Sequence, residues 1–496
     1  MLSFVCARNR LAFWKKPLAA FLLTTSPCAP PKHKIFVTEP VIVTRINMLR
    51  SRHHLRALSA AKPHRNEMHK HLEAPDLLDE FQSSKQRAFA AVEYVRGSHN
   101  YHPMPVVLAK GQGHKVWDVD GREYLDFLSA YSACNQGHCH PQIVRALQEQ
   151  AGTLALTSRA FYNDCLGEFT VKMTDVFRYN RVIPMNTGAE GVETAVKIAR
   201  RWGYRVKGIA PNQARLVFMK QNFHGRTLLA VSASDDPMSS ADFGPFVPNI
   251  DLCKFGDANE LETLLEQSGG NIAAVVLEPI QGEAGIIVPP AGYLKRVREL
   301  CTKHHVLMVA DEVQTGLCRT GTLLRVDAEN VRPDVVILGK ALSGGLYPLS
   351  AVLADDEVMN VLDPGSHGST FGGNPIAAKV GIAAIDVLLN ERLAERAQAS
   401  GEHFRRELER VLPSQVTVRG AGLLNAVIVP KSHSKLLGRE ATAFDVCLRL
   451  LNKHGVLCKP THEDIIRLAP ALAIPQQDLD RVVVAMEETI GTLFKD

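Results

Sequence analysis

A lysine at the end of a predicted buried strand is the residue of this 496-residue chain best suited to chemistry. The apolar run 335–338 leads through Gly339 to Lys340, and small residues and two glycines follow. Burial disfavours the charged form of an amine and lowers its pKa, and a neutral amine can form a Schiff base with an aldehyde. A strand-end lysine can also extend its ammonium into solvent, so the case for Lys340 depends on residues elsewhere in the chain.

Two other strand ends carry groups that complement a reactive amine. The run 306–310 ends at Asp311, and ligand sites in open α/β sheets lie beyond the carboxyl ends of strands. A carboxylate there can hold a proton on a pyridine nitrogen, although Asp311 could instead cap a helix. Gly188 follows the run 181–185 and begins a helical pattern, whose N-terminal N–H groups can bind phosphate. Alone, this turn could be a plain strand-to-helix connection.

Two predicted loops add an aromatic ring and charged groups. Phe223 and Arg226 lie in the turn 222–227, where the ring can stack on a planar cofactor and the guanidinium can bind a carboxylate through two hydrogen bonds. Glu283 lies in the glycine-containing loop 278–285, which is expected at the same sheet edge. Taken singly, Phe223 could be a core residue and Arg226 a surface ion pair.

The hydrophobic pattern predicts the elements that would bring these residues together. Between residues 130 and 372, apolar runs alternate with helical stretches, which is typical of a mostly parallel sheet covered on both faces. The apolar runs are 216–219, 228–232, 272–277, 306–310, 335–338 and 349–353. Short strands are expected at 115–119 and 124–127, and later at 416–418 and 424–429, before a last helix at 478–493. These outer segments predict a smaller α+β domain.

The charge of the chain is unevenly distributed. The net charge is +5, but residues 1–66 contain twelve basic residues and a single acid, Glu39. The rest of the chain is therefore mildly acidic and has no basic footprint for nucleic acid. No apolar run approaches the ~20 residues of a membrane-spanning helix, so neither nucleic acid nor membrane is an expected partner.

The basic N-terminal segment has the composition of an import signal. It is rich in Arg, Lys and His, and both Met1 and Met48 begin basic stretches. The apolar piece 18–23 could belong to a secretory signal, but the scattered cysteines of the body show no disulfide-like framework. We therefore expect residues 1–75 to be a leader, disordered or removed, and the protein to lie in the mitochondrial matrix. A downstream start, or a leader that is not an import signal, would leave it cytoplasmic.

Taken together, the motifs resemble those of the subgroup-III aminotransferases, which have the fold-type-I architecture and use pyridoxal 5'-phosphate. The resemblance runs from about Asn100 to Leu493 and rests on an anion-binding turn and on "FHGRT", "EPIQGEAG", "ADEVQTG", "GKALSGG" and "GSTFGGNP". It implies a large, mostly parallel-sheet domain and a smaller α+β domain built from both chain ends. The implied ranges are 76–128 and 373–496 for the small domain and 129–372 for the large one.

The resemblance also implies a role for each cofactor-binding residue. Lys340 would be the catalytic Schiff-base lysine, and Asp311 the catalytic partner of the pyridinium nitrogen. Gln314 would bond the ring hydroxyl, and Phe223 would stack on the ring.

The phosphate-binding residues imply an assembly. Gly188 and Ala189 would offer N–H groups to the phosphate within one chain. Thr370 would reach a phosphate across an interface, which implies a homodimer or a higher homo-oligomer.

The segments around Tyr101, Tyr131 and Arg467 narrow the implied substrates to L-ornithine and 2-oxoglutarate. The δ-amine would pass to the oxoacid, giving glutamate and glutamate 5-semialdehyde. The semialdehyde cyclises to pyrroline-5-carboxylate. The two tyrosines would bind the far end of ornithine, and Arg226 would pair with its carboxylate. Arg467 would bind the oxoacid and would be masked by Glu283 while ornithine is bound, since an uncovered arginine favours reaction at the wrong amine.

Three alternatives remain open from the sequence. Acetylornithine or 4-aminobutyrate could be the substrate, with the same cofactor chemistry. A non-catalytic binding or scaffold dimer would predict loss of Lys340 or Asp311, and both are present. His138-Cys139-His140 contains metal-ligand types, but adjacent residues cannot easily face one ion, so no metal is expected.

Overall fold

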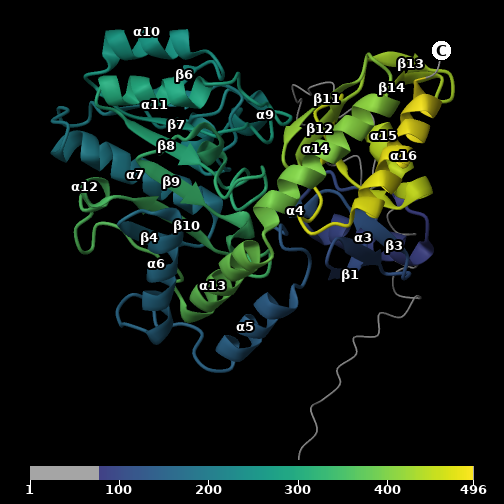
Figure 1. Cartoon of the computed structure of the whole chain (residues 1–496), viewed down its shortest axis with the longest axis horizontal. Coiled ribbons are helices and arrows are strands. Elements are labelled where there is room, and N and C mark those ends of the chain that lie inside the picture. The colour runs from purple at the N-terminus through teal and green to yellow at the C-terminus, as the bar shows by residue number, and fades with distance from the viewer. Residues whose placement is uncertain (1–77, 495–496) are drawn as a thin grey trace, which may run out of the picture. The chain divides into compact units, whose positions relative to one another are not determined.

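The computed structural model describes residues 78–494, and Figure 1 shows how their helices and strands are arranged. The predicted leader, residues 1–75, lies outside the described residues. Within the described part, no helix has both the length and the hydropathy needed to cross a membrane.

A seven-stranded sheet forms the larger part of the structure. Its strands, in spatial order, are β4 (Arg181–Met185), β10 (Ser350–Ala354), β9 (Val335–Leu338), β8 (Leu307–Asp311), β7 (Ile272–Leu277), β5 (Arg215–Met219) and β6 (Ile250–Cys253). Neighbouring strands are parallel except where β10 pairs with β9 and β4. The prediction of a mostly parallel sheet is therefore confirmed.

Both faces of this sheet are covered, which explains the nearly unbroken apolar runs. In β5, Leu216 and Phe218 pack in the same cluster as Trp202 of α7 (Gly188–Arg205). Val217 and Met219 point to the opposite face and pack in a second cluster with residues of α11 (Tyr293–Lys303). The other helices of this part are α5 (Pro141–Ala151), α6 (Asp164–Phe177), α10 (Ala258–Ser268) and α13 (Pro375–Asn390).

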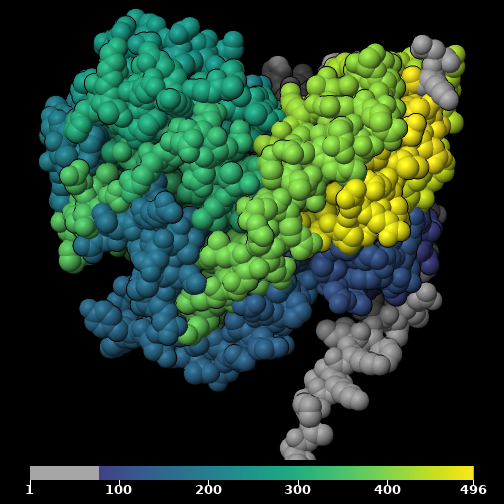
Figure 2. Space-filling model, in the orientation of Figure 1, coloured from purple at the N-terminus to yellow at the C-terminus, as the bar shows by residue number. Residues whose placement is uncertain are grey.

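Two four-stranded sheets form the second part, and one of them joins the two ends of the described chain. Its strands are β1 (Leu108–Gln112), β2 (Lys115–Asp118), β3 (Glu123–Asp126) and β15 (Val456–Leu457), with β15 parallel to β3. Figure 2 shows the dark-blue N-terminal part of the described chain beside the yellow C-terminal part. The predicted small α+β part built from both chain ends is therefore confirmed, while its boundaries at residues 128 and 372 stay a prediction.

The other four-stranded sheet contains β11 (Thr417–Ala421), β12 (Leu424–Ile428), β17 (Ile465–Leu468) and β16 (Lys459–Thr461). A hairpin of β13 (Ser432–Ser434) and β14 (Arg439–Ala441) lies nearby in sequence. The helices of this part are α3 (Ser84–Arg96), α14 (Leu393–Val411), α15 (Ala443–Arg449) and α16 (Gln476–Leu493). The last helix agrees with the prediction within two residues.

One predicted apolar strand is a helix instead. Residues Leu228–Ser232 form α8, because the Thr227 side chain accepts a hydrogen bond from the Ala230 N–H and caps the helix. Its five residues are too few for a helical period to stand out in the sequence. The remaining short elements are α4 (Ser129–Ser132), α9 (Pro237–Ser240), α12 (Asp356–Met359), η3 (Arg325–Glu329), η4 (Lys340–Ser343) and η5 (Leu450–His454).

Candidate active site

Lys340 follows the carboxyl end of β9 and begins the short helix η4. Its φ of 45° is left-handed, a conformation that concentrates at functional sites because it is unfavourable for residues with a Cβ. Burial lowers the pKa of its amine to about 8. Glu283 lies close enough to oppose this shift, but its carboxylate pairs with Arg467. The amine is therefore more easily deprotonated than that of an exposed lysine.

Asp311 ends the adjacent strand β8, where its Cα pairs with Ile337 of β9. Its carboxylate is almost fully buried and accepts hydrogen bonds from His224 Nδ1 at 2.7 Å and from the Val313 N–H at 3.1 Å. Burial disfavours the charged imidazole, but the hydrogen bond to Asp311 and the charges of Asp311 and Glu278 together outweigh burial and raise the pKa of His224. Sequence reasoning did not assign His224 to the site, although its place beside Phe223 was a signal. The imidazole fixes the orientation of the carboxylate.

The N-terminus of α7 presents backbone N–H groups that can bind an anion, and it lies beside Lys340. Thr187 caps this helix in a reciprocal pair with Glu190, which leaves the N–H groups of Gly188 and Ala189 without intrahelical acceptors. A cavity of about 290 Å³ is lined by residues from this turn and from η4, including Gly188, Lys340 and Ser343. An anion held by the helix would therefore share a cavity with the lysine.

Phe223 and Arg226 lie in the loop that follows β5. Phe223 is partly buried, and its backbone N–H donates to Glu278 Oε1 at 2.9 Å. The second oxygen of Glu278 accepts from the Gly282 N–H at 3.0 Å, so this buried carboxyl ties two site loops together. Burial raises its pKa to about 7. Arg226 is exposed, lies 5.4 Å from the centre of the Phe223 ring and donates to Ser239 Oγ.

Arg467 of β17 has no exposed surface, and two side chains bind its guanidinium. Nη1 donates to Glu283 Oε1 at 2.6 Å and Nη2 to Gln314 Oε1 at 2.8 Å. The Gln314 amide also donates to Glu283 Oε1 at 3.1 Å, which closes a triangle of three side chains. Burial disfavours the Glu283 carboxylate. The charge and the hydrogen bond of Arg467, together with Lys340 and Gln314, outweigh burial, so the pKa of Glu283 is lowered. The guanidinium is thus covered by a carboxylate.

The two predicted tyrosines approach neighbouring positions on one sheet. The Tyr131 ring centre lies 5.1 Å from Arg467 Cζ, and the exposed Tyr101 ring lies 6.0 Å from Lys459 Nζ. Lys459 and Arg467 are directly opposite each other in the β16–β17 ladder. Both rings therefore face the same part of the sheet, as binding of one substrate end requires.

Thr370 belongs to a segment that contacts the turn before α7. It is exposed and does not line the cavity that contains Lys340. The preceding residue, Ser369, accepts a hydrogen bond from Asn186 Nδ2 at 2.9 Å, which ties this segment to the turn before α7.

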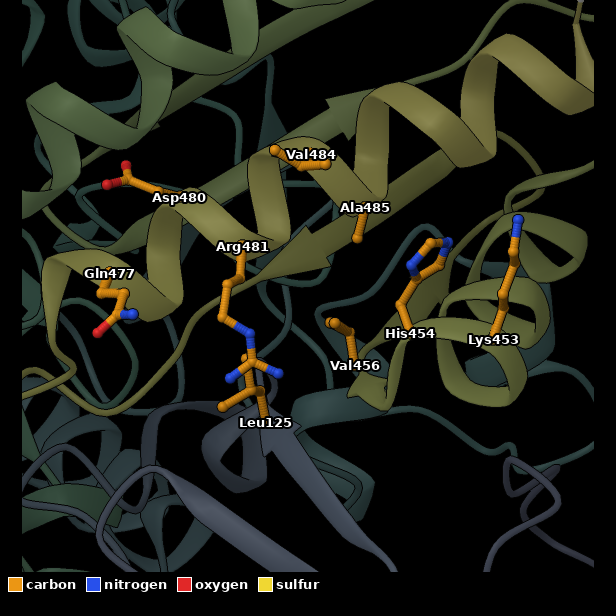
Figure 3. A pocket seen from close by; sticks show the side chains of 9 residues that line it. All are labelled: Leu125, Lys453, His454, Val456, Gln477, Asp480, Arg481, Val484 and Ala485. Carbon is orange, nitrogen blue, oxygen red and sulfur yellow. The ribbon is translucent and has the colours of Figure 1, made fainter.

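A second pocket, of about 550 Å³, lies along α16 in the smaller part (Figure 3). Its charged residues are already paired: Lys453 with Glu488, Arg481 with Asp478, and Asp480 with His403. His454, the other titratable residue of the lining, lies 3.8 Å from Glu488, but its buried Nε2 makes no hydrogen bond to any residue that the structure describes. His138 and His140 likewise pair with separate carboxylates, and no group of metal-ligand residues is found within residues 78–494.

The fold and the site together define the class of protein, and residues 96–490 match the family model of class-III aminotransferases. The chain belongs to this family. It is 55% identical over 396 residues to the mitochondrial ornithine aminotransferase of Rattus norvegicus, covering 79% of this chain and 88% of the relative. The Drosophila melanogaster enzyme of the same name is 54% identical over 82% of this chain and 92% of its own length.

Solved structures give the same family. The ornithine aminotransferase of Toxoplasma gondii ME49 is similar with a TM-score of 0.78 and 43% identity, over 82% of this chain and 95% of that one. An acetylornithine aminotransferase from Elizabethkingia anophelis has a TM-score of 0.73 and 50% identity, over 82% and 98%. A further Toxoplasma gondii structure is described with pyridoxal phosphate partly occupying its active site.

Proposed function

We propose that this chain is an ornithine δ-aminotransferase. It transfers the δ-amino group of L-ornithine to 2-oxoglutarate, giving glutamate and glutamate 5-semialdehyde. The semialdehyde cyclises to pyrroline-5-carboxylate. The observation that carries the proposal is the fully buried Arg467, covered by Glu283 and flanked by Tyr131. Such a site can receive a cationic amine first and a dianion second.

The cofactor is pyridoxal 5'-phosphate, whose aldehyde captures an amine and whose ring accepts the electrons released at the neighbouring carbon. The residues fit this group: a lysine with a lowered pKa shares a cavity with a helix N-terminus. Gly188 and Ala189 would hold the phosphate, and Phe223 would lie against the ring. Gln314 would bond the ring hydroxyl through its side-chain amide, which in this structure bonds Arg467 and Glu283.

Lys340 and Asp311 divide the chemistry between them. With a pKa of about 8, the Lys340 amine can accept a proton from the substrate carbon that bears the nitrogen and return it as the ammonium. Asp311, whose carboxylate is oriented by His224 Nδ1 at 2.7 Å, would hold a proton on the ring nitrogen.

Glu283 and Arg467 control which amine reacts. While they are paired, the site has no free cation for a carboxylate near the reacting carbon, and ornithine enters by its δ-amine. Tyr101, Tyr131 and Arg226 would hold the α-ammonium and α-carboxylate. When 2-oxoglutarate enters, Glu283 would leave Arg467 free to bind its distal carboxylate.

We also propose that two chains form a homodimer. Thr370 and Phe371 are exposed, as are Phe161 and Tyr162, and large exposed aromatic residues are typical of interfaces. A partner covering this segment would bring Thr370 to the phosphate.

The import composition of residues 1–75 and the mitochondrial names of several relatives support a location in the mitochondrial matrix. We propose residues 129–372 as the main range of the large domain, on which α13 also packs through α5 and α6.

An acetylornithine aminotransferase is the second candidate, because one such enzyme is 50% identical in the aligned structure. The test is to mix the cofactor-loaded protein with ornithine, N-acetylornithine or 4-aminobutyrate and follow the cofactor absorbance in a single turnover. We expect a rapid change with ornithine only, and pyrroline-5-carboxylate as product. A faster response to N-acetylornithine would establish the second candidate instead.

A further inference from the structure

The segment that carries Tyr131 has an unusual backbone. Residues 129–132 all lie in the left-handed region, with φ values of 47°, 49°, 60° and 72°. None of them is glycine, and a Cβ makes this conformation unfavourable at each position. Leu128 and Ala133, on either side, return to the right-handed helical region. A short left-handed turn of this kind persists only where the surrounding structure holds it.

Asp126, the last residue of β3, holds the start of this turn. Its Oδ1 atom accepts the backbone N–H groups of Leu128 at 2.8 Å and Ser129 at 3.0 Å. Its Oδ2 atom accepts a hydrogen bond from His138 Nε2 at 2.7 Å. The carboxylate is almost fully buried, so these bonds are shielded from water.

His138 is itself fixed on the other side. Its backbone exchanges two hydrogen bonds with Gly113, at 2.8 and 2.9 Å. Its ring packs against β1 so closely that a Cβ on Gly111 would lie 2.9 Å from His138 Cγ. Hydrogen bonds to Asp126 and, to a lesser extent, to Cys134 raise the pKa of His138 to about 10, so the imidazole is cationic at neutral pH. Asp126 is therefore held by a charged partner that cannot easily move.

The turn decides where the Tyr131 ring lies. The ring centre lies 5.1 Å from Arg467 Cζ, while the two Nη atoms of the guanidinium bind Glu283 and Gln314. A right-handed backbone at residues 129–132 would direct the Cα–Cβ bond of Tyr131 differently and remove this contact. The clamp residues themselves do not contact Arg467 or Lys340 through any hydrogen bond or ion pair found within residues 78–494.

We propose that Asp126 and His138 clamp the left-handed turn and are positioning residues that set Tyr131 against Arg467, and thereby set the affinity for ornithine. The effect on substrate rests on the proposed function, whereas the clamp does not depend on it. A glutamine at position 138 could still donate an amide N–H to Asp126, and an alanine could not.

The test compares His138→Ala, His138→Gln and a matched control, His140→Ala. The control breaks a histidine–carboxylate pair, His140 with Glu391 at 2.9 Å, that lies two residues further along and does not contact the turn. Hydrogen exchange of the Leu128 and Ser129 amides reports the clamp, and kcat and KM for ornithine report its consequence. For His138→Ala we expect exchange at least about tenfold faster. We expect a KM about tenfold higher with a nearly unchanged kcat.

His138→Gln is expected to restore both measurements, and His140→Ala to match the unaltered protein. Gly111→Ala, which pushes on the same ring from β1, should reproduce His138→Ala. Ala130→Gly, at an exposed position where glycine tolerates the positive φ, should recover part of the KM in the His138→Ala background.

Three outcomes would overturn parts of the argument separately. Unchanged exchange in both His138→Ala and Gly111→Ala would refute the clamp, as would a His138→Gln variant that is as impaired as His138→Ala. Faster exchange with an unchanged KM would refute the role in ornithine binding. An unaltered protein that does not turn over ornithine would refute the proposed function, while the exchange data would still decide the clamp.

Discussion

Burial lowers the pKa of two lysines to about 8, and the two lysines lie at opposite ends of the strands of the seven-stranded sheet. Lys340 follows β9 at the carboxyl edge, whereas Lys207 binds the carbonyl of Ile272, the first residue of β7, at the amino edge. The two amines therefore have similar pKa values in different surroundings.

Lys207 has its hydrogen bonds satisfied. Its ammonium donates to the carbonyls of Gly269, Ile272 and His304 at 2.7, 2.8 and 3.1 Å, and so it ties the ends of three elements together. For Lys340, no acceptor of its amine is found within residues 78–494, and it lies in a cavity beside a helix N-terminus. A lowered pKa therefore does not identify a catalytic lysine, because the same value also results from a structural role.

The largest expected effect comes from Lys340→Ala. Without an amine to move the proton, turnover of ornithine should fall by about 10⁴-fold or more, while the protein should remain folded. Steady-state kinetics and thermal unfolding of the same preparations check this. A variant that kept a tenth of the activity would contradict the assignment of Lys340.

Asp311→Asn should have the second largest effect. The amide cannot carry the negative charge that favours a proton on the ring nitrogen, and loss of one such electrostatic partner costs about 10²–10³-fold in kcat. His224 would lose its acceptor charge as well, so its pKa should fall below the raised value that Asp311 now supports. NMR titration of His224 checks the second effect independently of activity, and Asp356→Asn, an exposed carboxylate paired with Arg181, is the control.

Glu283→Gln should change selectivity more than rate. Loss of the carboxylate leaves Arg467 uncovered, so the ratio of kcat/KM for ornithine to that for glutamate should fall by about tenfold. Competition assays with both amino donors measure this ratio. Glu463→Gln, which breaks an exposed pair with Lys431, should leave it unchanged. An equal loss for both donors would mean that Glu283 supports catalysis and does not mask Arg467.

The two edges also differ in how far the sequence predicts them. The strand ends that carry Lys340 and Asp311 are predictable because an apolar run followed by polar residues is a local pattern, and strand register then brings their side chains together. The bond of Gln314 to Arg467 joins residues 153 positions apart, and that of His224 to Asp311 joins residues 87 apart. Such partners depend on packing that no local pattern contains. The left-handed turn at 129–132 was missed for the same reason, since its stability comes from Asp126 and His138 rather than from glycine.

The smallest expected effect on activity comes from Lys207→Met, which keeps the length of the side chain and removes its donors. Three carbonyls would lose a charged donor, and we expect the free energy of unfolding to fall by about 2 kcal/mol with kcat nearly unchanged. The pH dependence should change as well. Because the folded state lowers the pKa of Lys207 from 10.5 to about 8, the unfolded chain binds more protons between these values, and stability rises with pH across this window.

Lys207→Met removes that contribution, so its stability should rise less between pH 8 and 10.5 than that of the unaltered protein. Urea unfolding at a series of pH values measures the difference. In the cofactor-free protein, Lys340→Ala should flatten the same curve, because Lys340 has a pKa lowered in the same direction. The contrary result would be a Lys207→Met variant that stays folded but does not turn over ornithine. In that case the three hydrogen bonds of Lys207 would not distinguish a structural lysine from a catalytic one.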